Sequence, residues 1–230
     1  MVNVLNKLKK IFMADKVIPR GKEWPDEQQG VLPEDWQPDE TTDELTELDP
    51  DPEYLQYSAE AVGYIDRSSQ WECYRIISNF VNGEDSILDF GCGRGDYKLF
   101  VSQEYNTDLN YIGIDMNENL INAGKSVYKD LIDIQCLDWF SIDQNVKQDW
   151  CINVKSNNLR YDADMKTSDE DYLKRTITSM YDHCNKGLIL LLDSNIHDAG
   201  NIFNWSHDKF GGAAIDHSFS NNEYILIIYK

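Results

Sequence analysis

The segment 87-ILDFGCGRGD-96 passes from an apolar run directly into three glycines, Gly91, Gly93 and Gly95. The run 86-SILDF-90 has the composition of a short buried strand, and the residues after the glycines indicate a helix to Tyr105. Glycines at such a junction let the backbone turn sharply and approach a ligand closely, and the helix that follows offers free N–H groups. A simple tight turn would use the same glycines, so this loop alone does not specify a ligand.

Acidic residues close the next two predicted strands. Asp115 ends 111-YIGID-115, where a carboxylate can accept hydrogen bonds from both ribose hydroxyls. Asp138 ends 133-DIQCLD-138, where it can accept from an adenine amino group. Met116 and Trp139 follow these two acids and can pack on the adenine faces. Together with the glycine loop, these positions predict a site for a cofactor that contains adenosine.

The glycine spacing separates two classes of cofactor. A dinucleotide fingerprint, G-x-G-x-x-G, would place its third glycine at position 96, which is Asp96. The acid-x-Gly-x-Gly-x-Gly spacing from Asp89 instead resembles the first motif of class I S-adenosylmethionine-dependent methyltransferases. A cofactor without phosphates carries an ammonium group, which suits acidic neighbours such as Asp89 and Asp96.

The resemblance to this superfamily covers about residues 57 to 230 and follows the family's order of loop, ribose acid, adenine acid and final hairpin. It implies S-adenosyl-L-methionine as the cofactor. It places Asp89, Gly91, Gly93, Gly95 and Asp96 at the methionine end, Asp115 and Met116 at the ribose and adenine, and Asp138 and Trp139 at the adenine. Gln70 and Tyr57, which precede the first strand, are weaker candidates for a lid over the cofactor.

Alternating helical and strand patterns extend on both sides of this segment. A fourth apolar run at 150–154 and the continuously apolar 187-GLILLLDS-194 predict parallel strands, and 213–219 with 223–230 predict an antiparallel hairpin. We therefore expect an α/β, Rossmann-like fold. Its sheet would be mostly parallel and seven-stranded, with a C-terminal antiparallel hairpin and helices on both faces.

Helix boundaries follow from capping residues. Ser69 with Glu72 fits a capping box for a helix before the first strand, and Ser168 with Asp171 fits a second one. Asn185 and Gly187 would end the second helix.

The N-terminal quarter of the chain has a different composition. All six prolines lie between Pro19 and Pro52, and the stretch from Gly21 to Glu60 holds fourteen acidic residues against one basic residue. We therefore divide the chain into residues 1–55, an amphipathic helix and an extended acidic arm, and residues 56–230, the methyltransferase domain. Trp24 and Trp36 are unusual in a solvated tail, and they indicate a protein partner for this arm.

Composition limits the remaining classes. The net charge of −20 and the absence of a catalytic Pro-Cys or Asn-Pro-Pro-aromatic signature argue against a nucleic-acid substrate. Five cysteines without a C-x-x-C pair support neither disulfides nor a metal site, and no stretch of about 20 apolar residues occurs. The chain is therefore expected to be cytoplasmic and to lack a transmembrane segment.

The methyl acceptor is the least specified part of the prediction. Acceptor-facing residues in the superfamily follow the fourth strand, which here ends with Asn153 and Val154, and His197 follows the fifth strand. Asn153 and His197 are accordingly the catalytic candidates, with a small molecule or a protein side chain as the acceptor. A methyltransferase-like fold that serves as a structural or interaction module, docked through its N-terminal arm, remains open as the alternative.

Overall fold

The computed structural model describes residues 56–158 and 169–230. The proposed N-terminal arm and the Ser168 cap lie outside these residues. The elements are η1 (Glu60–Val62), α3 (Arg67–Ser78), β1 (Ser86–Phe90), α4 (Asp96–Tyr105), β2 (Asn110–Asp115), α5 (Glu118–Tyr128), η2 (Lys129–Leu131), β3 (Asp133–Cys136), η3 (Trp139–Ser141), β4 (Gln148–Val154), η4 (Ser156–Asn158), α6 (Asp169–His183), β5 (Cys184–Asp193), α7 (Ala199–Phe210), β6 (Ala213–Asp216) and β7 (Glu223–Tyr229).

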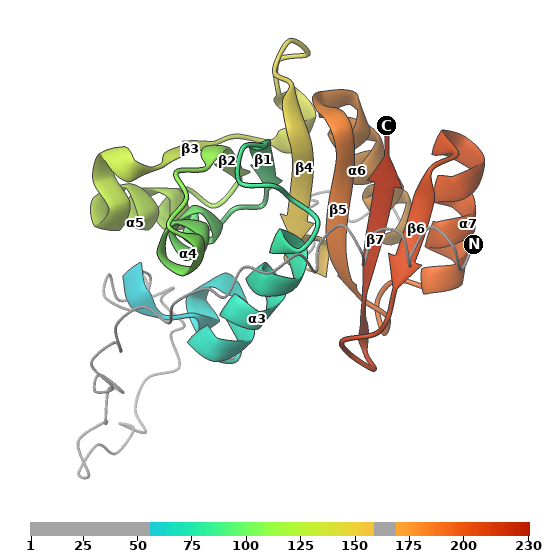
Figure 1. The fold of residues 1–230 in the computed structure, drawn as a ribbon, viewed down its shortest axis with the longest axis horizontal. Helices are drawn as coiled ribbons and strands as arrows, with labels where there is room; N and C mark the ends of the chain where they lie inside the picture. The colour runs from blue at the N-terminus through green and yellow to red at the C-terminus, as the bar shows by residue number, and fades with distance from the viewer. Residues whose placement is uncertain (1–55, 159–168) are drawn as a thin grey trace, which may run out of the picture. The chain divides into compact units, whose positions relative to one another are not determined.

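Seven strands form one sheet in the order β3-β2-β1-β4-β5-β7-β6, which Figure 1 shows from left to right. The first five strands in this order pair in parallel, and β7 pairs antiparallel with both β5 and β6. The expected Rossmann-like fold, with its C-terminal antiparallel hairpin, is thereby confirmed.

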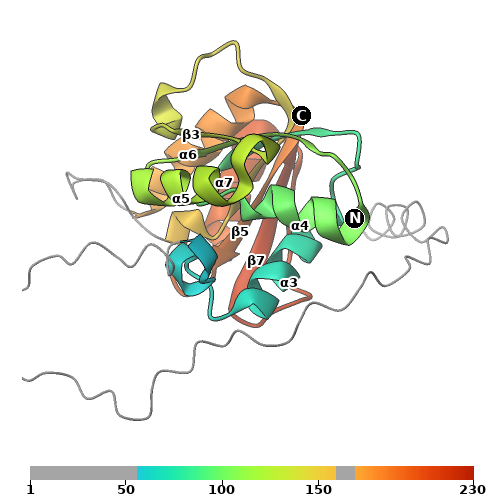
Figure 2. The ribbon, with the colours of Figure 1, turned by 90° about the vertical axis from the view of Figure 1, so that its left-hand side faces the viewer.

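Alternate residues of the central strands face two separate cores. On β5, Ile189 and Leu191 pack with side chains of α3, α4 and α5, whereas Leu188, Leu190 and Leu192 pack with α6 and α7. A strand that is buried on both faces needs apolar residues at every position, which explains the continuous apolar run of β5. Figure 2 shows α3 and α4 side by side on their face of the sheet.

Two predicted helix boundaries are wrong. The N-cap of α3 is Asp66, whose carboxylate accepts from the Ser69 N–H at 2.7 Å, so the capping box is Asp66 with Ser69 and not Ser69 with Glu72. Asn185 and Gly187 do not end α6, because both belong to β5. A Cβ on Gly187 would lie 2.5 Å from the Ile228 carbonyl oxygen and 2.8 Å from the Trp150 ring, so this glycine permits close strand packing and is not a helix cap.

The strand order reverses beside β1. The chain runs from β1 outward to β2 and β3 and then returns to place β4 on the other side of β1. Ligands of open α/β sheets bind at the carboxyl ends of the strands next to such a reversal. Among the helices of the described ranges, none has both the length and the apolar composition needed to cross a membrane.

Candidate functional site

The glycine loop folds over the carboxyl end of β2. The N–H groups of Gly91 and Cys92 both donate to the Ile114 carbonyl, at 2.8 and 3.0 Å. Gly91, Gly93 and Gly95 all have positive φ, at 77°, 57° and 83°. Residues with a Cβ rarely adopt this conformation, which accounts for a glycine at every second position of the loop.

The structure brings Asp115 into contact with this loop. Its Oδ2 accepts from the Gly93 N–H at 2.8 Å, and its Oδ1 accepts from the Asn117 N–H at 2.8 Å. Asp115 is partly buried, and burial raises the pKa of its carboxyl group above the ordinary value. The predicted ribose acid therefore lies directly beside the predicted methionine loop.

Asp89 is a buried residue near the carboxyl end of β1, close to Asp115. It is 3% exposed, and its Oδ2 accepts a hydrogen bond of 2.7 Å from the Tyr111 hydroxyl. Burial raises the pKa of the Asp89 carboxyl to about 7, although the Tyr111 hydrogen bond acts in the opposite direction, and the nearby Asp115 charge raises it further. A carboxylate in this position is stabilised by any cation that comes close to it.

Asp96 is held in a buried polar network. Its Oδ2 accepts from Arg94 at 2.7 Å and from Gln70 Nε2 at 2.8 Å, and its Oδ1 accepts from the Tyr128 hydroxyl. Burial by itself would raise the pKa of Asp96, but the Arg94 guanidinium, together with the Tyr128 hydrogen bond and the Arg67 charge, lowers it below the ordinary value. Gln70, a lid candidate, is fully buried in this network, whereas Tyr57, the other one, is 59% exposed.

The adenine candidates surround the ends of β2 and β3. Met116 is 39% exposed, and Asp138 caps η3 by accepting from the Phe140 N–H at 2.9 Å. Trp139 is only 3% exposed, and its ring packs against Phe140 and Tyr172 in the core under α6. Met116 and Asp138 are therefore exposed or partly exposed, while the Trp139 ring is enclosed in the core.

Asn153 and His197 occupy the neighbouring edge of β4 and β5. The Asn153 Nδ2 donates to the Phe90 carbonyl at 2.9 Å and to Ser156 Oγ at 2.5 Å, which joins the ends of β1 and β4. The His197 Nε2 lies 3.1 Å from the Asn157 carbonyl oxygen. Burial lowers the pKa of His197, so its imidazole is neutral at physiological pH. The structure brings both candidates to this edge, and both side chains are engaged with the protein.

No group of three His, Cys, Asp or Glu side chains in the described ranges could hold a metal ion. Comparison with protein families and with curated proteins yields no match.

Solved structures do resemble this chain. A SAM-dependent methyltransferase from Aquifex aeolicus superposes with a TM-score of 0.55 at 11% identity, over 78% of this chain and 98% of that one. The PH0226 protein from Pyrococcus horikoshii OT3 gives a TM-score of 0.52 at 12% identity, over 76% and 94%. A methyltransferase from Pyrococcus furiosus gives 0.51 at 13% identity, over 70% and 83%. The chain has the fold of SAM-dependent methyltransferases. Identities this low establish the fold and nothing finer.

Among further polar residues of this fold, Ser156 and Asn157 belong to the segment after the fourth strand where acceptor-facing residues were expected, whereas Tyr111 had no signal in the sequence. Tyr111 occupies an apolar position of β2, yet its hydroxyl bonds Asp89. Ser156 Oγ donates to the Phe90 carbonyl at 3.0 Å. Asn157 is 4% exposed, and its side-chain amide has no hydrogen-bond partner among the described residues. For Tyr111, the rule that a buried hydroxyl needs a hydrogen-bond partner could have indicated the contact.

Proposed function

We propose that this protein is an S-adenosylmethionine-dependent methyltransferase that acts on a small molecule or a protein side chain by in-line methyl transfer. The observation that carries the proposal is the contact between Asp115 and the Gly93 N–H. This contact joins a glycine loop and a ribose-binding acid at the point where the strand order reverses.

The residues at this edge suit a cationic cofactor without phosphates. Asp89 and Asp115 both have raised pKa values because burial disfavours their charged forms. A ligand that brings an ammonium and a sulfonium group would stabilise both carboxylates, whereas a pyrophosphate would add negative charge beside them. The chemistry of these donors therefore fits S-adenosylmethionine better than a dinucleotide.

Each residue has a proposed role in holding the cofactor. Asp115 would accept from the ribose hydroxyls, and Asp89 with the loop glycines would face the methionine end. Met116 and Asp138 would contact the adenine, and Trp139 would support that contact from the core. Asp96 would act through Arg94 and Gln70, because its carboxylate is already bonded to them.

The acceptor would enter beside β4 and β5, opposite the adenosine site. When bound, S-adenosylmethionine supplies a methyl group on a positively charged sulfur. The protein then has to hold the acceptor in line with that group and, for a weak nucleophile, accept a proton. We assign Asn153 to positioning at this edge and His197 to proton acceptance, since its imidazole is neutral.

Titration calorimetry with S-adenosylhomocysteine tests the proposal. The parent protein should bind it, and Asp115→Ala should weaken binding about ten- to a hundredfold, because hydrogen bonds to a charged group contribute about 1.5–3 kcal/mol. Asp115→Asn keeps an oxygen that can accept from the Gly93 N–H but removes the negative charge. Its affinity therefore distinguishes the contribution of Asp115 to the shape of the loop from its contribution to ribose binding. Asp133→Ala, which removes an exposed carboxylate at the other end of β3, serves as the matched control and should change nothing.

Failure of the parent to bind would contradict the proposal and favour the alternative of a methyltransferase-like interaction module. Binding of NAD by the parent would overturn the choice of cofactor.

We also propose a cytoplasmic location. All five cysteines are free, four of them buried. Free thiols are typical of proteins in a reducing compartment.

A further inference from the structure

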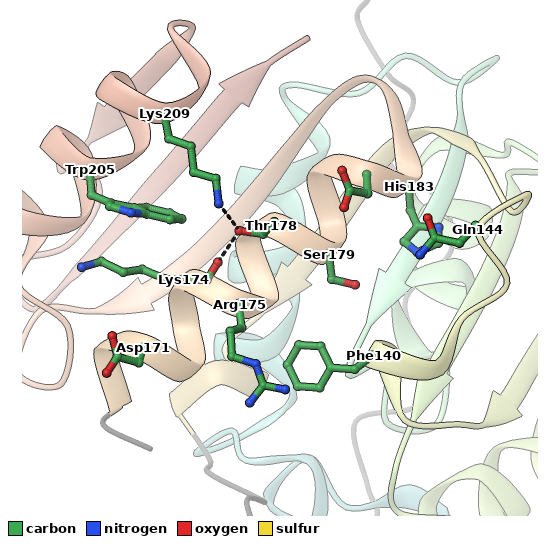
Figure 3. Close-up of a pocket in the computed structure, with 11 residues that line it drawn as sticks. Phe140, Gln144, Asp171, Lys174, Arg175, Thr178, Ser179, His183, Trp205 and Lys209 are labelled. Carbon is green, nitrogen blue, oxygen red and sulfur yellow. Dashed lines mark hydrogen bonds between the residues drawn. The ribbon is translucent and has the colours of Figure 1, made fainter. Parts of the chain in front are cut away.

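A groove separate from the strand ends runs along the outer side of α6 and α7. Its volume is about 650 Å³, and its walls include Phe140, Lys174, Arg175, Thr178, Trp205 and Lys209. Figure 3 shows the long side chains of both helices converging on this groove, with the Trp205 indole between Lys174 and Lys209. We call it the α6–α7 groove. It belongs to the helical face of the molecule, and none of the proposed cofactor-binding residues lines it.

Positive charge gathers in the centre of the groove. The ammonium groups of Lys174 and Lys209 lie 5.6 and 5.0 Å from the Trp205 ring centroid. Lys209 also donates to Thr178 Oγ1 at 2.8 Å, and Lys174 pairs with Glu170. The chain as a whole has a net charge of −20, so this centre contrasts with the charge of the protein.

Among the cations of this centre, Arg175 has guanidinium N–H groups that are available to a ligand. Its guanidinium lies over the Phe140 ring, 4.4 Å from the centroid, and it forms no ion pair with a residue of the described ranges. The side chain is exposed. A guanidinium that is stacked on an aromatic ring keeps its planar edge available, and this edge matches a carboxylate with two parallel hydrogen bonds.

Carboxylates limit the length of the positive region. Asp171 and Asp182 also line the groove, and they lie on α6 with the cations between them. Their separation of eleven positions corresponds to roughly 16 Å along a helix, or about five residues of an extended peptide. A continuous polyanion such as a nucleic-acid strand would meet repulsion at both limits, whereas one or two carboxylates on a short segment would not.

We propose that the α6–α7 groove binds a short acidic segment of a partner protein. A glutamate or aspartate of that segment pairs with Arg175, and apolar side chains next to it pack on Phe140 and Trp205. The small size of the contact makes the interaction weak and sensitive to salt. This inference does not depend on methyl transfer, because the groove shares no residue with the proposed cofactor site.

Fluorescence anisotropy with a labelled peptide that carries two carboxylates, Gly-Ser-Glu-Phe-Glu-Ser-Gly, tests the proposal on the full-length protein. We expect binding at low salt that is lost at about 0.5 M salt, where charges are screened within a few ångströms. Arg175→Glu should weaken binding about tenfold or more, and Arg175→Lys should weaken it less. Lys125→Glu makes the same charge change at an exposed position of α5 and should leave binding unchanged.

The proposal would be overturned by no binding to the parent, by equal loss in Arg175→Glu and Lys125→Glu, or by equal binding of a peptide with lysine in place of glutamate. Tighter binding of a ten-nucleotide oligothymidylate, also lost in Arg175→Glu, would overturn it in favour of a nucleic-acid partner. Thermal unfolding of Arg175→Glu beside the parent shows whether the variant is folded, independently of any cofactor.

Discussion

Asp89 combines a structural disadvantage with a proposed functional use. The side chain is buried, and the pKa of its carboxyl is raised to about 7, while an unfolded chain would have the ordinary value near 4. The folded protein therefore favours the protonated form. The resulting stability is fully present below pH 4 and is lost as the pH rises toward 7. A natural protein keeps such a group where a ligand uses its charge.

Asp89→Asn separates the two effects. The amide is neutral at every pH, so the variant should melt at a higher temperature than the parent, with a difference that grows from pH 4 to pH 7 and then levels off. The gain should be on the order of a few kcal/mol, or several degrees. The same variant should bind S-adenosylhomocysteine more weakly. Melting curves across pH and calorimetry at pH 7.5 check both parts, and a variant that is more stable with unchanged affinity would remove Asp89 from the site.

Cofactor binding should also release protons near neutral pH. A cation beside Asp89 lowers the pKa of that carboxyl, so affinity should rise between pH 6 and pH 8. Calorimetry at pH 7 in two buffers of different ionisation enthalpy measures this release. Equal binding enthalpies in the two buffers would show that no proton leaves.

The sequence offered candidate site residues because glycines and acids stand where predicted strands end. Their partners were not identifiable. Tyr111 looks like a core residue, and Arg94 looks like a solvated loop residue although it is fully buried against Asp96. The Tyr111–Asp89 contact depends on β1 and β2 becoming neighbours, and the burial of Arg94 and Asp96 depends on Gln70 of α3 and Tyr128 of α5 packing over the loop. Neither arrangement can be read from local spacing.

At the scale of elements, α5 is tied to the glycine loop through Gly124. A Cβ on Gly124 would lie 2.3 Å from the Arg94 carbonyl oxygen, a distance that real Cβ atoms do not reach. Gly124→Ala should therefore displace the loop, destabilise the protein by about 1–3 kcal/mol and weaken cofactor binding. Gly200→Ala in α7 is the matched control, because its nearest neighbour is 3.4 Å away, and it should be neutral or slightly stabilising. Similar melting temperatures for the two variants would refute this account of the packing.

Strands were predicted more accurately than helix limits. The apolar runs of β1, β2, β4 and β5 are long enough to be distinct from loops. By contrast, two residues, Asp66 and Ser69, each have a suitable partner three positions later and could be the N-cap of α3. Which of them is the N-cap depends on how the helix turns Tyr74 and Ile77 toward the core. Gly187 is a residue type common at helix ends, but position 187 requires glycine because the Trp150 ring of the neighbouring strand lies too close for a side chain.

At the scale of the whole molecule, the described residues form a complete sheet with a core on each face. The acidic arm was assigned to a partner protein from its composition, so a protein that consists of residues 56–230 should fold alone. Its melting temperature should stay near that of the full chain, and its affinity for S-adenosylhomocysteine should be unchanged. Thermal unfolding and calorimetry compare the two forms. A loss of several degrees, which corresponds to about 1–2 kcal/mol, would mean that the arm packs on the domain instead.

The position of β7 has a consequence for the order in which the protein can form. This strand follows β6 in the sequence, yet it lies between β5 and β6, and Ile225, Leu226 and Ile228 are completely buried. During synthesis, β5 has β4 on one side, but its other edge has no partner strand until residues 223–229 have been made. Both faces of β5 are apolar. An apolar edge exposed for that time is a template for pairing with other chains. Chains that lack residues 223–229 should therefore aggregate, and the pairing of β7 with β5 should be the step that commits this domain to its native state.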